Sequence, residues 1–112
     1  MYQTHVDLPP TKIEAAMPPE VMFTGPSAYR LKFNDAVADY EKVFVYADRQ
    51  AVQNRFSQTD GPTNLIVLKE DTFLKRYASS PPLAQIYVDL WNMKEWYAQD
   101  YVNALKNKMF VQ

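Results

Sequence analysis

The residues of this chain that could do chemistry are acidic side chains placed after a glycine and a serine. Gly25 and Ser27 stand at the expected start of a helix. Asp39 and Glu41 lie two residues apart before an apolar run, and Glu70 follows the next apolar run. Two carboxylates joined by a third from a neighbouring strand would bind magnesium, which phosphoryl transfer uses to hold the attacking and leaving oxygens.

This order of residues is similar to that of nucleotidyltransferases, in which a glycine-serine turn opens a helix and two acids lie on the following strand. Here Pro26 separates Gly25 from Ser27 and removes a backbone N–H that a phosphate would need. Asp39 and Glu41 precede the apolar run instead of lying within it. The pattern favours a solvated acid pair in a degenerate version of that fold. A transferase that uses magnesium and a nucleoside triphosphate is the alternative.

The composition of the chain excludes several classes of function. Its 112 residues suit one domain, and they include no cysteine, which rules out thiolate catalysis and cysteine zinc sites. The net charge is −1 with both signs mixed along the chain, so we expect no direct binding of nucleic acid. We see no signal peptide and no apolar run long enough to cross a membrane, and therefore expect a soluble cytoplasmic protein.

Strands and helices alternate along the sequence. Short apolar runs rich in β-branched and aromatic residues predict strands over residues 20–25, 42–47 and 64–69. Helices are expected over residues 26–33, with Leu31 facing inward, and 48–56, with Asp48 as the N-cap. The predicted fold is α/β (α+β), a small mixed sheet of about three or four strands flanked by helices, with two helices at the C-terminus.

The beginning of the chain has a different character. Residues 1–19 carry two Pro-Pro pairs around a short helical segment in which Thr11 and Glu14 fit a capping box. We interpret residues 1–19 as a proline-rich lead-in and residues 20–112 as a single α/β domain.

The last part of the chain predicts two helices joined by a turn near residues 92–94. Ser80 before Pro81 is typical of a helix start. Apolar residues then recur at helical spacing, which predicts a buried stripe that includes Trp91: Leu83, Ile86, Tyr87, Leu90 and Trp91. A second stripe begins at Tyr97.

Aromatic residues around this turn are the candidate partner-binding residues. Trp96 and Tyr97 are adjacent, so one of them should point away from the face that the other occupies. An exposed aromatic side chain of this kind suits an interface anchor. The candidates are Trp96, Tyr97 and Tyr101, with a core role as the alternative.

Several segments together resemble one family. A T-G-x-x-A turn and helix, a V-x-V-Y strand and an S-P-hydrophobic-Q-x-Y-x-D-L helix occur here in that order. They are carried by Thr24, Gly25 and Ala28, by Val43, Val45 and Tyr46, and by Ser80, Pro81, Gln85, Tyr87, Asp89 and Leu90. Over residues 21–105 the chain resembles the C-terminal domain of AbiEi-type antitoxins and related transcriptional regulators of type IV toxin–antitoxin systems.

The resemblance implies a function without catalysis. Family members usually begin with a winged-helix DNA-binding domain, which we do not find before Pro18. What remains is a protein-interaction or effector domain whose partner is another protein, such as a cognate toxin, with no cofactor and no membrane. The alternatives are the magnesium-dependent transferase built on Gly25, Ser27, Asp39, Glu41 and Glu70, and a stand-alone structural domain.

Overall fold

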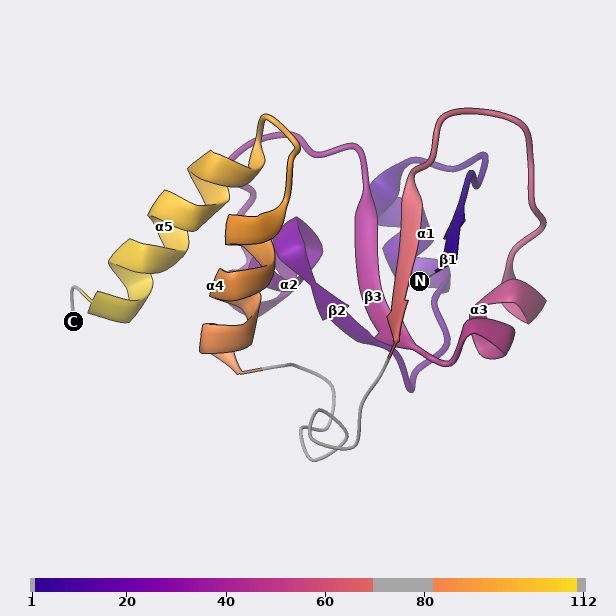
Figure 1. Cartoon of the computed structure of the whole chain (residues 1–112), viewed down its shortest axis with the longest axis horizontal. Coiled ribbons are helices and arrows are strands. Elements are labelled where there is room, and N and C mark those ends of the chain that lie inside the picture. The colour runs from indigo at the N-terminus through magenta and orange to yellow at the C-terminus, as the bar shows by residue number, and fades with distance from the viewer. Residues whose placement is uncertain (1, 70–81, 111–112) are drawn as a thin grey trace.

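The computed structural model describes residues 2–69 and 82–110 and places them in a four-stranded mixed sheet with five helices (Figure 1). The strand order is β1-β4-β3-β2, with β3 and β4 parallel and both outer strands antiparallel to their neighbours. This is the α/β class, with two C-terminal helices, that the sequence predicts. The elements are β1 (Tyr2–Thr4), α1 (Pro10–Ala16), β2 (Met22–Thr24), α2 (Gly25–Phe33), β3 (Val43–Ala47), α3 (Arg49–Arg55), β4 (Leu65–Lys69), α4 (Leu83–Asn92) and α5 (Ala98–Phe110).

One face of the sheet packs against α1 and α3. Val43 and Val45 of β3, with their partners on β4, are fully buried on this face. Ile13 from α1 and Val52 from α3 belong to the same apolar cluster. Because side chains alternate along a strand, Phe44 lies on the opposite face of the sheet. This face borders a cavity, and we call it the cavity face. The predicted alternation of this strand is confirmed.

A second core forms beside the sheet, where α2, α4 and α5 gather on the side of β2 (Figure 1). Tyr29 from α2, Ile86 and Leu90 from α4, and Leu105 from α5 are each exposed by 2% or less. The cluster explains why the C-terminal helices have strong apolar periodicity although they do not cover the whole sheet.

The beginning of the chain belongs to the core, which differs from the expected lead-in. β1 pairs with the free edge of β4, with Tyr2 opposite Val67, and Ile13 of α1 is fully buried. The helix begins after Pro9, and Glu14 does not close a capping box with Thr11, because its carboxylate turns toward α2. A three-residue strand without apolar alternation carries no sequence pattern of its own, so only the pairing with β4 defines it.

Other local predictions have mixed outcomes. Asp48 is the N-cap residue of α3, although its side chain makes no capping hydrogen bond. Leu31 is 50% exposed, so its predicted inward orientation is wrong. The predicted helix start at Ser80 and Pro81 lies outside the described residues, and the described part of that helix begins at Leu83. Within the described ranges, no helix has both the length and the apolar character needed to cross a membrane.

Candidate functional site

The outer side of α4 carries two exposed apolar side chains, Val88 and Trp91, beside the partly buried Tyr87, and we call these three residues the α4 ridge. Trp91 is 64% exposed and Val88 is 48% exposed. The rings of Tyr87 and Trp91 stack with centroids 6.3 Å apart and an interplanar angle of 19°. Together with Asn92, the ridge borders a shallow hollow of about 400 Å³. Adjacent exposed apolar side chains of this kind can mark a surface for protein interaction.

The exposure of Trp91 corrects the prediction that it lies in the core. Ile86 and Leu90 are the α4 residues that are fully buried, at 0% and 1% exposure. Trp91 is about 100° further around the helix than Leu90, because an α-helix has 3.6 residues per turn. The covered stripe is therefore narrower than the apolar stripe in the sequence, and Trp91 falls outside it.

The predicted partner-binding residues separate into one exposed and two buried side chains. Trp96 is 69% exposed, whereas Tyr97 and Tyr101 are exposed by 1% and 0%. This confirms that one member of the Trp96–Tyr97 pair points away from the face that the other occupies. The Tyr101 hydroxyl donates a hydrogen bond to the carbonyl oxygen of Ala38 at 2.5 Å. Trp96 is the one of the three candidates whose side chain is open to a partner.

Hydrogen bonds to Asp89 fix α4 against the sheet. Its Oδ2 atom accepts hydrogen bonds from the hydroxyls of Thr24 and Tyr46, both at 2.7 Å. The Oδ1 atom accepts one from the Gln85 side chain at 2.9 Å. Asp89 thus joins the ends of β2 and β3 to the helix that carries the α4 ridge. The sequence identified Gln85 and Asp89 only as part of a family pattern and gave no indication of this role.

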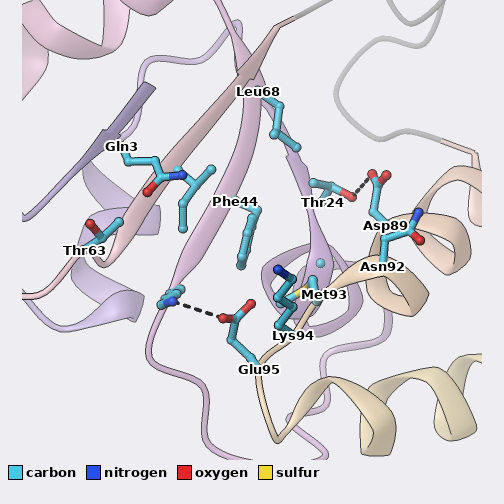
Figure 2. Close-up of a pocket in the computed structure, with 13 residues that line it drawn as sticks. Gln3, Thr24, Phe44, Thr63, Leu68, Asp89, Asn92, Met93, Lys94 and Glu95 are labelled. Atoms are coloured by element: carbon cyan, nitrogen blue, oxygen red, sulfur yellow. Dashed lines mark hydrogen bonds and ion pairs between the residues drawn. The ribbon is translucent and has the colours of Figure 1, made fainter. Parts of the chain in front are cut away.

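A cavity of about 430 Å³ lies between the cavity face of the sheet and the turn from α4 to α5 (Figure 2). Its floor is formed by Phe44, Ile66 and Leu68. Lys42 Nζ lies 3.0 Å from Glu95 Oε2 at its border. The walls contain further polar residues of β1, β2, the loop before β4, α4 and the turn from α4 to α5: Gln3, Thr24, Thr63, Asp89, Asn92 and Lys94.

Gly25 closes one end of this cavity. It has a φ of +66°, a left-handed conformation that glycine adopts without strain. A Cβ atom at this position would lie 3.4 Å from the Met93 sulfur and 3.5 Å from Phe44 Cδ1. The glycine is thus explained by backbone geometry and close packing.

Of the other residues of the predicted transferase site, Ser27, Asp39 and Glu41 are described, and none of them lines the cavity. Ser27 is fully buried and donates a hydrogen bond to Glu14 Oε2 at 2.6 Å. Asp39 and Glu41 are exposed in the segment between α2 and β3 and do not line the cavity. Glu70 lies outside the described residues. Among the residues whose positions are described, no group of three or more His, Cys, Asp or Glu could hold a metal ion.

The strands present apolar side chains where the transferase hypothesis needs acids. On β3 and β4 the side chains that face the cavity are Phe44, Ile66 and Leu68. None of them can coordinate magnesium, which requires oxygen ligands. The arrangement suits binding of apolar groups on this face of the sheet.

A buried polar cluster around Glu14 was not anticipated from the sequence. The Glu14 carboxylate accepts hydrogen bonds from Ser27, Arg30 and Tyr40 and forms an ion pair with Arg30. Burial is the largest cause that raises the pKa of the Tyr40 hydroxyl above its usual value, and the hydrogen bond to Glu14 adds to it. The cluster joins α1, α2 and the segment before β3.

No protein-family model matches this chain, and neither a curated protein nor a solved structure matches it.

Proposed function

We propose that this chain is a non-enzymatic protein-interaction domain that binds a partner protein through the α4 ridge and Trp96. The observation that carries the proposal is the exposure of both tryptophans, Trp91 by 64% and Trp96 by 69%. Tryptophan is enriched among the residues that dominate binding energy at protein interfaces. Two such side chains on one helix and the turn that follows it form a pair of anchors.

The surroundings of these anchors favour tight binding. Tyr87 stacks on Trp91, so part of the ordering of these rings is already present in the free domain. The hydrogen bonds of Asp89 hold α4 to the sheet, which limits movement of the ridge when a partner binds. A rigid apolar surface loses little conformational entropy on association.

The resemblance to AbiEi-type antitoxins favours a cognate toxin or a regulator as the partner. Within the shared Q-x-Y-x-D-L pattern, Asp89 and Leu90 hold the helix in place, whereas Tyr87 belongs to the outward ridge. The pattern thus contains residues for both folding and binding. The net charge of −1 favours a protein partner over nucleic acid.

The test is a binding measurement with the protein encoded next to this chain in its genome. We expect Trp91→Ala and Trp96→Ala each to weaken the affinity by about tenfold or more, as loss of an interface anchor does. Leu31→Ala is the matched control, because Leu31 is an exposed apolar residue on α2. Equal affinity of all three variants and the unchanged chain would exclude the α4 ridge as the binding surface.

A further inference from the structure

The cavity face of the sheet offers a binding surface that is separate from the α4 ridge. Phe44 and Ile66 are direct neighbours in the parallel register of β3 and β4, and Leu68 is the next β4 residue on the same face. The space above them is about 430 Å³. Cavities that bind small molecules typically have roughly 300–1,000 Å³ and a largely apolar lining.

The charged groups around this floor differ in their partners. Lys42 Nζ contacts Glu95 at 3.0 Å, and Asp89 accepts hydrogen bonds from two hydroxyls and one amide. Lys94 forms no ion pair or hydrogen bond with any residue in the described ranges. Its side chain projects from the α4–α5 turn toward the cavity beside Phe44 (Figure 2). The donors to Asp89 are neutral, so Lys94 is the cationic group of this lining that no carboxylate in the described ranges engages.

Neutral donors lie in the same lining. Thr63 and Asn92 border the cavity, and neither side chain has a hydrogen-bond partner among the residues described here. A hydroxyl and an amide N–H can both donate to a carboxylate oxygen. Thr63 and Asn92 lie on opposite sides of Phe44 (Figure 2), so they can donate to acceptor atoms on either side of a ligand that covers the apolar floor.

We propose that this cavity binds a small aromatic carboxylate, with its ring on Phe44 and Leu68 and its carboxylate at Lys94. An aromatic ring gains apolar contact with the floor and favourable ring packing with Phe44. The Lys94 ammonium can pair with one carboxylate, whereas a polyphosphate would add several negative charges to a lining that already holds the Asp89 carboxylate.

The test uses naphthoate as the probe and naphthamide as its neutral counterpart, with the methyl resonances of Ile66 and Leu68 as the readout. We expect naphthoate to shift both resonances and to bind more tightly than naphthamide. Lys94→Gln should lower the affinity for naphthoate about fivefold, which is the upper range for the loss of an exposed ion pair. The affinity for naphthamide should stay unchanged in that variant.

Lys106→Gln is the matched control, because Lys106 is an exposed lysine of α5 that does not line the cavity. Leu68→Trp, which fills the space above the floor, should abolish the Ile66 shift while its circular dichroism shows an intact fold. Shifts confined to the α4 ridge, or equal binding of both probes, would overturn the proposal. Because the probes are read at the sheet, this result is independent of partner binding through Trp91.

Discussion

The hydroxyl of Thr24, the last residue of β2, donates a 2.7 Å hydrogen bond to the carboxylate of Asp89 on α4, 65 positions later in the chain. Thr24 is 1% exposed, so its hydroxyl depends on this acceptor. Tyr46 donates to the same oxygen. A single carboxylate therefore connects the sheet to the helix that carries the α4 ridge and one wall of the cavity.

Removal of this carboxylate should destabilise the domain. Asp89→Ala leaves the buried Thr24 hydroxyl without its acceptor, and hydrogen bonds to charged groups contribute about 1.5–3 kcal/mol each. We expect a loss of about 2–3 kcal/mol in the free energy of unfolding, measured by urea denaturation. Asp7→Ala, a change at an exposed position, should cost less than about 0.5 kcal/mol. Equal stability of both variants would contradict the role of Asp89.

The buried cluster around Glu14 gives a second stability prediction. Glu14→Ala removes the acceptor of the fully buried Ser27 hydroxyl and the ion-pair partner of Arg30. Breaking a buried ion pair typically costs about 3–5 kcal/mol, and the Arg30 side chain is 29% exposed, so we expect the lower end, about 3 kcal/mol.

The matched control is Glu20→Ala, because Glu20 is exposed between α1 and β2. Both variants are compared with the unchanged chain in the same urea titration. If Glu14→Ala unfolds at the same urea concentration as Glu20→Ala, the cluster does not stabilise the fold.

The elements that could be predicted from the sequence are those in which apolar residues recur at a regular spacing. Val43 and Val45 alternate with Phe44, and the register of β3 with β4 places them on the two faces as expected. Ile86 and Leu90 likewise lie on the buried stripe of α4. Period and apolar character are properties of the chain itself, so they can be read without knowledge of the neighbours.

Features that depend on distant partners could not be predicted in this way. Trp91 has the spacing of a core residue, but α2 and α5 do not extend over it. Glu14 fits a local capping pattern, whereas its actual partners include Tyr40, 26 positions away. The cavity depends on the approach of Met93 to Gly25, which no local pattern indicates.

The buried hydroxyl of Tyr97 should make the folded domain less stable in alkaline solution. Burial is the largest cause that raises the pKa of its hydroxyl from 10.0 to about 12. Above pH 10 the unfolded chain loses this proton while the folded chain retains it, so the free energy of unfolding decreases between pH 10 and about 12. Below pH 10 the hydroxyl keeps its proton in both states, and its contribution to the free energy of unfolding is fully present.

The measurement is urea denaturation as a function of pH, with Tyr97→Phe as the comparison. One tyrosine of this kind changes the free energy of unfolding by at most about 1.4 kcal/mol per pH unit. The Phe variant lacks the ionisable group, so its stability should decrease less steeply above pH 10. Identical slopes for both proteins would show that Tyr97 ionises equally in the folded and unfolded chain.

Calorimetry with magnesium and each nucleoside triphosphate separates the interaction domain from a transferase. We expect no heat of binding, because Phe44, Ile66 and Leu68 occupy the cavity-facing strand positions and the Ser27 hydroxyl is engaged by Glu14. Asp39→Ala/Glu41→Ala is the control, and its titration should be indistinguishable from that of the unchanged chain. Heat that depends on magnesium and disappears in this double variant would mean that the exposed acids bind metal, and the transferase would replace the interaction domain as the function of this chain.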